Sequence, residues 1–190
     1  MIKLSVLINT IDERHEEMVN LYHDLIIQVG DYPVEILVLM DNKKRTIGEK
    51  RTSLLQVAKG EYVTTVDDDD DISDDYIDEL MKAIESGSDV ITFKQQASID
   101  DETFTVTFGM NNENEQLTRG FNDKFVDIKR KPFHVCAWKR ELVKDIIFPS
   151  ANYSEDWAWC EEALLRVQTE THIDKVLHYY KFSTTGTRAT

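Results

Sequence analysis

The sequence predicts an α/β protein in which helices cover both faces of a mainly parallel sheet. Short apolar runs rich in β-branched residues recur along the first half of the chain, and segments with helical apolar spacing lie between them. Capping residues precede these segments and glycines follow them. Strand and helix therefore alternate, which is typical of a doubly wound parallel sheet.

Four strands and three helices are predicted within residues 3–93. The runs that predict the strands are 3–9, 34–40, 61–66 and 90–93. The predicted helix starts are two capping boxes and one serine cap: Thr10 with Glu13, Thr46 with Glu49, and Ser73. The predicted helix ends are three glycines: Gly30, Gly60 and Gly87.

The second half of the chain is less regular. Residues 103–110 alternate like a strand, and 125–129 form a shorter run that would pair with it. Residues 98–131 are therefore predicted to be an insertion of strands over the sheet. Ser154 is predicted to cap a helix that begins with Glu155 and Asp156, and a last strand is predicted over 173–182.

The composition is that of one soluble domain spanning residues 1–190. Its 36 acidic and 22 basic residues give a formal charge of −14, which argues against broad electrostatic binding to nucleic acid or anionic membrane. Cys136 and Cys160 are too few for a disulfide framework. No apolar segment is long enough for a membrane helix or a signal peptide. We therefore expect a cytoplasmic protein without stable membrane insertion.

Five consecutive aspartates, at positions 67–71, directly follow the third predicted strand. Acidic runs are commonly solvated, but ligands of open parallel sheets bind at the carboxyl ends of the strands. Thr10 and Asp41 end the first two strands and would lie at that same edge. Asp67 and Asp69 stand at alternate positions, and carboxylate oxygens suit Mg²⁺, Mn²⁺ or Ca²⁺. The run therefore indicates a divalent-cation site, with a solvated loop as the alternative.

Residues 51–70, RTSLLQVAKGEYVTTVDDDD, resemble the nucleotide-sugar core of the family 2 glycosyltransferases, which have the GT-A fold. In that family an Arg-Asn pair opens a helix that ends in Ala-x-Gly-Glu-Tyr, and an apolar strand then leads to Asp-x-Asp-Asp. The opening SVLINTIDER is similar to the family's first strand and turn, and FPSANYSEDWAWCEE is similar to the segment with its catalytic base. The departures are Thr52, where the family has asparagine, and DNKKRT, which lacks the family's glycine and serine.

The resemblance implies a donor half, residues 1–95, with a role for each matching residue. The residues that would bind the nucleotide-sugar are Thr10, Glu13, Asp41, Arg51, Asp67 and Asp68. Asp69, together with Asp67, would hold the cofactor Mn²⁺ or Mg²⁺ on the diphosphate, with Asp70 in support.

The resemblance also implies an acceptor half, residues 96–190. Asp156 would be the catalytic base that deprotonates the acceptor hydroxyl, and Glu155 would position Asp156 or the acceptor. Trp157 and Trp138 would contact the acceptor, with packing in the core as the alternative for both. His178 is a further candidate metal ligand, with a structural role as its alternative.

The function implied by the resemblance is metal-dependent, inverting transfer of a sugar from a nucleotide-diphosphate sugar, in particular a UDP-sugar. The acceptor hydroxyl would belong to a glycan, a protein or a modified DNA base. One alternative is a nucleotidyltransferase of related fold, although TIDER replaces the Gly-rich loop that such enzymes usually carry after the first strand. Another is a non-catalytic module that binds a divalent cation or a sugar nucleotide. Such a module would have no turnover that depends on Asp156.

Overall fold

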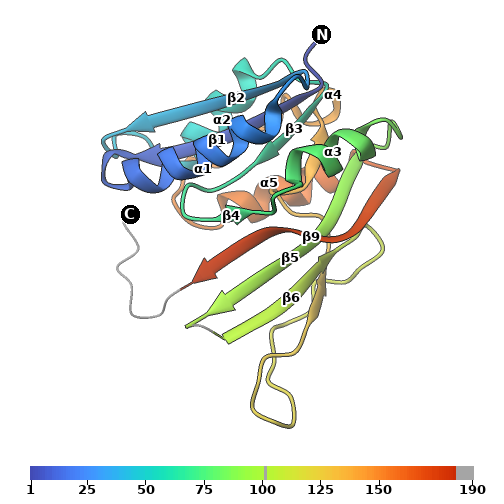
Figure 1. The fold of residues 1–190 in the computed structure, drawn as a ribbon. Coiled ribbons are helices and arrows are strands. Elements are labelled where there is room, and N and C mark those ends of the chain that lie inside the picture. Colours follow the sequence, from blue (N-terminus) through green and yellow to red (C-terminus); the bar gives the residue numbers. More distant parts are fainter. Residues whose placement is uncertain (101, 183–190) are drawn as a thin grey trace.

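One mixed β-sheet runs through the residues that the computed structural model describes, 1–100 and 102–182 (Figure 1). The strands follow the order β2, β1, β3, β8, β5, β6 and β7, with β9 paired to β5 and β4 paired to β9. Their bounds are β1 Leu4–Ile11, β2 Val34–Asp41, β3 Tyr62–Thr65, β4 Asp71–Ile72, β5 Val90–Ile99, β6 Glu102–Phe108, β7 Ile128–Arg130, β8 Ala137–Lys139 and β9 Glu170–Phe182. Both halves of the chain therefore contribute to the same sheet.

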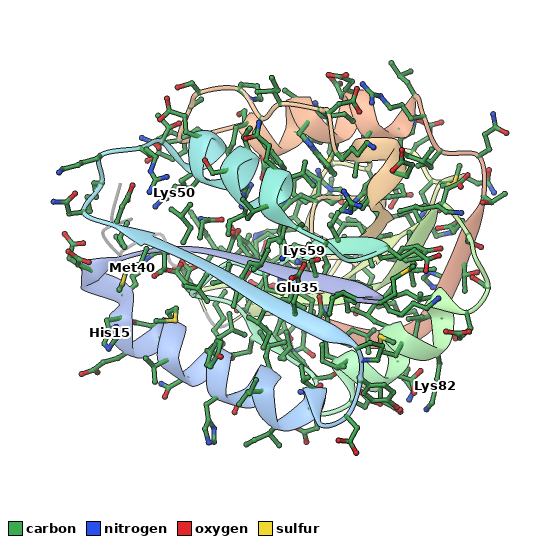
Figure 2. All side chains as sticks on the ribbon, turned by 90° about the horizontal axis from the view of Figure 1, so that it is seen from above. His15, Glu35, Met40, Lys50, Lys59 and Lys82 are labelled. Atoms are coloured by element: carbon green, nitrogen blue, oxygen red, sulfur yellow. The ribbon has the colours of Figure 1, made fainter. Side chains whose placement is uncertain are left out.

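Helices cover both faces of the parallel part of this sheet. They are η1 Asp12–Arg14, α1 His15–Val29, α2 Ile47–Val57, α3 Tyr76–Ile84, α4 Arg140–Val143 and α5 Glu155–Leu164. β1 lies between β2 and β3, is parallel to both, and is buried along its whole length. Figure 2 shows His15 of α1 and Lys82 of α3 on the side of the sheet opposite Lys50 of α2. The predicted fold class is confirmed.

The start of α2 is determined by a local pattern and by one close approach. Thr46 Oγ1 accepts a hydrogen bond from the Glu49 amide at 3.2 Å, and Glu49 Oε2 accepts one from the Thr46 amide at 2.8 Å, so this predicted capping box is confirmed. A Cβ at Gly48 would lie 1.8 Å from the carbonyl oxygen of Pro149. Glycine therefore lets the first turn of α2 lie directly against the segment that leads into α5.

Two of the three other predicted helix starts are wrong, those at Thr10 and Ser73. Thr10 lies inside β1, because pairing with β2 continues to Ile11, and α1 begins at His15 after the short helix η1. α3 begins at Tyr76, three residues after Ser73. The Ser73 hydroxyl donates to the Asp75 carboxylate and does not cap the helix. The predicted start after Ser154 is confirmed, because α5 begins at Glu155, but Ser154 has the left-handed conformation, with φ 62°, and its side chain makes no capping hydrogen bond.

The second half of the chain enlarges the sheet at one edge. β6 pairs antiparallel with β5, and β7 pairs parallel with β6, so the predicted strands around 103–110 and 125–129 extend the sheet rather than lie over it. β8 was not predicted, and it separates β3 from β5. β9 runs parallel to β5 and reaches β4, where His178 is opposite Ile72. This pairing brings the last strand to the aspartate run.

Within residues 1–100 and 102–182, no helix combines the length and apolar character that crossing a membrane requires. Cys136 and Cys160 are both buried and both free.

Candidate functional site

Two adjoining pockets open at the carboxyl ends of β1 and β3. The larger has a volume of about 340 Å³ and the smaller about 210 Å³. The residues that line both are Asn9, Arg14, Ile47, Asp68 and Asn152. The shared lining makes them two parts of one site, at the sheet edge where the sequence predicted a ligand.

The smaller pocket has a basic wall built around Asp41. The Asp41 carboxylate accepts hydrogen bonds from the backbone amides of Lys43 at 3.2 Å and Arg45 at 3.3 Å, and from Arg45 Nε at 3.2 Å. The buried Lys50 ammonium lies 3.5 Å from Asp41 and donates to the Thr10 carbonyl oxygen at 2.9 Å. Burial favours protonation of Asp41, but Lys50 and Arg45 outweigh it and hold its pKa below the usual value. Asp41 therefore orders the loop that presents Lys43 and Arg45 to the pocket.

Glu13 lies outside both pockets. Its side chain is largely exposed and forms an ion pair with Lys43 at 3.1 Å. Its neighbour Arg14 reaches the site instead. Glu13 therefore touches the predicted nucleotide-sugar site only through Lys43, a lining residue of the smaller pocket.

The aspartate run is not a uniformly solvated loop. Asp68 and Asp70 are each 4% exposed, whereas Asp71 is exposed and pairs with Lys181. Arg14 bridges Asp68 at 2.8 Å and Asp69 at 3.0 Å. Each inner aspartate thus has its own surroundings, which contradicts the solvated-loop alternative for this part of the run.

Several polar atoms of the run are suited to a cation. Two buried oxygens of the run, Asp68 Oδ2 and Asp70 Oδ1, have no hydrogen-bond partner. His178 fits its structural alternative instead, because Nδ1 lies 2.9 Å from the Gln95 amide nitrogen, which donates, and Nε2 lies 3.3 Å from Asp70 Oδ2. Among the described residues no three His, Cys, Asp or Glu side chains are grouped as a complete metal site. The protein would thus supply only part of a coordination shell, as proteins commonly do for Mg²⁺ bound together with substrate phosphates.

Asp69 lines the larger pocket, and its negative charge is unfavourable in these surroundings. Burial of its carboxylate, followed by repulsion from the neighbouring aspartates, raises its pKa to about 6 although Arg14 acts in the opposite direction. A divalent cation would relieve that repulsion. Asp69 is therefore the best placed of the predicted metal ligands, because Asp67 is already paired with Arg51 at 2.6 Å.

Replacing Asp69 with asparagine is expected to stabilise the protein at neutral pH. The pKa of Asp69 is raised from 3.8 to about 6, so the ionised form destabilises the fold above that pH. Since the side chain is 48% exposed, solvent screening limits the gain to about 1 kcal/mol, or a few degrees in Tm. Thermal unfolding should show this gain shrink as the pH falls from about 6 towards 3.8. A gain of equal size across that range would contradict the explanation.

Arg51 joins the two sides of the larger pocket. It is 3% exposed, and its guanidinium binds Asp67 at 2.6 Å and Glu155 at 2.8 Å. Its Nε lies 3.4 Å from Asn9 Oδ1, and Nη2 lies 3.3 Å from Nε2 of His134. Burial raises the pKa of Glu155, against the effect of Arg51. Glu155 is therefore an internal partner of Arg51 at the start of α5.

Asp156 lines the larger pocket together with Glu155, and it is the more exposed of these two carboxylates of α5. Its side chain is 25% exposed, and Oδ2 lies 4.0 Å from Arg51 Nη1 and 3.6 Å from His134 Nδ1. Oδ1 accepts a hydrogen bond from the Trp157 amide at 2.7 Å. The same pocket is lined by Asp67, Asp68 and Asp69. The fold therefore brings the predicted catalytic base and the aspartate run, far apart in the sequence, into one cavity.

The two predicted acceptor tryptophans differ in position. Trp157 is 37% exposed beside Asp156 but lines neither pocket. Trp138 is 1% exposed, donates from Nε1 to the Phe133 carbonyl oxygen at 3.0 Å, and meets Trp159 edge to face. The prediction for Trp138 is wrong, because its ring belongs to the core and has no surface to offer an acceptor.

Several residues of the site were not predicted, among them Arg14, Asn152 and His134. Charge balance indicates that some cation lies near the five adjacent aspartates, but it does not single out Arg14 among the 22 basic residues. Asn152 accepts a hydrogen bond from the Ile47 amide at 3.0 Å and lines both pockets. His134 has no local sequence signal, since its partners Asp67 and Asp156 come from distant segments.

The fold is the GT-A fold of the glycosyltransferase class that the sequence resembles. Residues 16–147 match the model of glycosyl transferase family 2. The chain therefore belongs to glycosyl transferase family 2, which confirms the predicted family. No curated protein matches the sequence.

Solved structures of TarS from S. aureus share this GT-A fold. One TarS structure matches the present chain with a TM-score of 0.66 and 17% sequence identity, and the match covers 95% of the present chain and 37% of the TarS chain. TarS residues 1–349 with UDP-GlcNAc give 0.66 at 18% identity, over 95% and 58% of the two chains. The complex of the same TarS residues with UDP gives 0.65 at 18% identity, over 96% and 61%. The present chain thus spans less than two thirds of the length of these structures.

Proposed function

We propose that this protein is a metal-dependent, inverting glycosyltransferase that uses a UDP-sugar. The observation that carries the proposal is the larger pocket, of about 340 Å³, which is lined by Asp67, Asp68 and Asp69 together with Asp156. One group of carboxylates can take part in binding a metal diphosphate while another accepts a proton. The TarS structures with UDP and with UDP-GlcNAc support a donor of this class.

The smaller pocket is proposed to bind the nucleoside part of the donor. Thr10 lines it and Asp41 shapes its basic wall, while Arg51 and Asp67 line the larger pocket. Arg14 lines both pockets and would interact with the diphosphate. A cation held by Asp69, with Asp68 beside it, would neutralise the diphosphate and stabilise the charge that develops on the leaving group.

The proposed reaction is a single displacement at the anomeric carbon. The acceptor oxygen forms a bond to that carbon as the bond to the diphosphate oxygen breaks, and the bonding electron pair leaves with UDP. The carboxylate of Asp156 takes the proton of the acceptor hydroxyl. Because the acceptor enters from the face opposite the leaving group, the anomeric configuration inverts. Glycans, proteins and modified DNA bases are the acceptor classes to screen.

Calorimetric titration with UDP, with and without Mn²⁺, is the experiment that tests the donor site. Wild type is expected to bind UDP more tightly with Mn²⁺, and Asp69→Asn should lose at least about tenfold of that affinity because a ligand of the ion is removed. Asp71→Asn is the matched control, since Asp71 belongs to the same run but is exposed and pairs with Lys181. Absence of binding by any nucleoside diphosphate, with any divalent metal, would contradict the proposal.

A further inference from the structure

His134 lies beneath the larger pocket, between its two groups of carboxylates. The segment that carries it is tied to β3, because the Thr65 hydroxyl donates to the His134 carbonyl oxygen at 3.1 Å and the Thr64 hydroxyl donates to that of Val135 at 2.8 Å. The imidazole is 5% exposed and does not line the pocket. It therefore acts on the site only through the side chains that it contacts.

The two ring nitrogens of His134 face different partners. Nε2 lies 3.3 Å from Arg51 Nη2 and 3.6 Å from Asp67 Oδ2. Nδ1 lies 3.6 Å from Asp156 Oδ2, is buried, and has no hydrogen-bond partner. Buried polar atoms are nearly always hydrogen-bonded in folded proteins. The unpartnered Nδ1 beside the candidate base therefore calls for an explanation.

Arg51 determines which nitrogen of His134 carries the proton. A guanidinium group only donates hydrogen bonds, so the short contact between Arg51 Nη2 and His134 Nε2 requires Nε2 to accept. In a neutral imidazole the proton then resides on Nδ1, which faces Asp156. A second proton on Nε2 would point at the guanidinium and remove the contact. The geometry thus selects the Nδ1–H tautomer.

We propose that His134 is a positioning residue for Asp156, whose carboxylate it orients by donating from Nδ1–H to Oδ2. This inference rests on the proposed function, in which Asp156 takes the acceptor proton. Oδ1 of Asp156 already accepts from the Trp157 amide at 2.7 Å, so a donor on Oδ2 holds both oxygens. The 3.6 Å separation closes when substrate binds, as hydrogen bonds of catalytic groups commonly do. Arg51 therefore links the aspartate run to the base through His134.

Side-chain ¹⁵N–¹H spectra of the wild-type protein test the tautomer without any substrate. Among the 5 histidines, the His134 signals are assigned by their loss in His134→Asn. Nδ1 is expected to be protonated and Nε2 unprotonated, and Asp156→Ala should shift the Nδ1–H signal. A proton on Nε2, or an Nδ1–H signal that does not respond to Asp156→Ala, would overturn the proposal.

Two substitutions separate positioning from a purely structural role. The amide nitrogen of asparagine replaces Nδ1, so His134→Asn keeps a donor to Asp156, whereas the amide nitrogen of glutamine replaces Nε2. With Mn²⁺ and a UDP-sugar that wild type hydrolyses, kcat for UDP release should stay within about threefold in His134→Asn and fall at least about tenfold in His134→Gln, the effect of a lost hydrogen bond to a charged group. KM should change by less than about threefold in both.

Equal losses of kcat in the asparagine and glutamine variants would overturn the positioning role, as would a loss confined to KM. Failure of the proposed function is distinguishable from this result, because wild type would then bind no UDP and release none from any donor. The tautomer measurement would in that case still decide whether His134 donates to Asp156. Thermal unfolding of both variants shows whether either loss reflects a damaged fold.

Discussion

Replacing Arg51 with methionine is expected to destabilise the protein by about 3–5 kcal/mol, because it leaves buried carboxylates without their cation. Arg51 is 3% exposed and binds Asp67 at 2.6 Å and Glu155, itself 4% exposed, at 2.8 Å. Methionine has a similar length but no charge, so neither partner is compensated. Burial would favour protonation of Asp67, yet the Arg51 guanidinium holds its pKa well below 3.8. The stabilisation is thus present at neutral pH and is lost only when acid protonates Asp67.

Urea unfolding at neutral pH measures the effect of Arg51→Met. The control is Lys82→Met on α3, where the ammonium is 63% exposed and pairs with Asp78 and Glu79. Exposed pairs of this kind contribute about 1 kcal/mol or less. A loss in Arg51→Met no larger than in Lys82→Met would show that the Arg51 network does not hold β3, α2 and α5 together.

Replacing Asp156 with asparagine is expected to lower kcat for sugar transfer by a factor of about 10²–10⁴, the usual contribution of a positioned general base. Asparagine keeps the shape of the side chain but cannot take a proton from the acceptor hydroxyl. Asp156 makes no direct bond to the aspartate run, so the affinity for UDP with Mn²⁺ should change by less than about threefold. Initial rates of UDP release, with water or a screened acceptor, measure kcat. Calorimetry measures the affinity for UDP with Mn²⁺.

Glu161→Gln is the matched control for Asp156→Asn. Glu161 lies on the same helix, α5, but is exposed and lines neither pocket. Its substitution removes one negative charge at a short distance from the site, and it should leave kcat within about twofold. A binding module without catalytic activity would show no turnover in any of these proteins. Equal rates in wild type and Asp156→Asn would assign the base to another residue.

Much of the fold could be predicted because its signals are local. The capping box of Thr46 and Glu49 acts within one helical turn, and the buried runs of β1, β2 and β3 need no partner to be recognised. β8 escaped prediction because three residues, Ala137–Lys139, are too few to show a period. The pattern of Thr10 and Glu13 was misleading, because pairing of β1 with β2 holds Thr10 in a strand. Tertiary hydrogen bonds outweighed a local preference there.

The candidate site was predictable where its residues belong to a motif and not where they depend on distant contacts. Asp69 and Asp156 were recognised from their segments, and both line the larger pocket. Trp138 was mistaken for a surface residue, because a tryptophan looks the same in sequence whether it packs in the core or faces a ligand. Nothing near Arg14 or His134 in the chain indicated the carboxylates that they contact.

The sequence by itself determined the family, the order of strands and helices in the first half, and the edge of the sheet at which the aspartates gather. Those properties follow from periodicity, capping and short motifs, which act over a few residues. The tertiary structure alone decided which aspartates are buried, that Arg51 and His134 connect Asp67 to Asp156, and that Trp138 belongs to the core. Charge pairing and burial depend on distances between segments far apart in the chain, and only the assembled sheet brings those segments together.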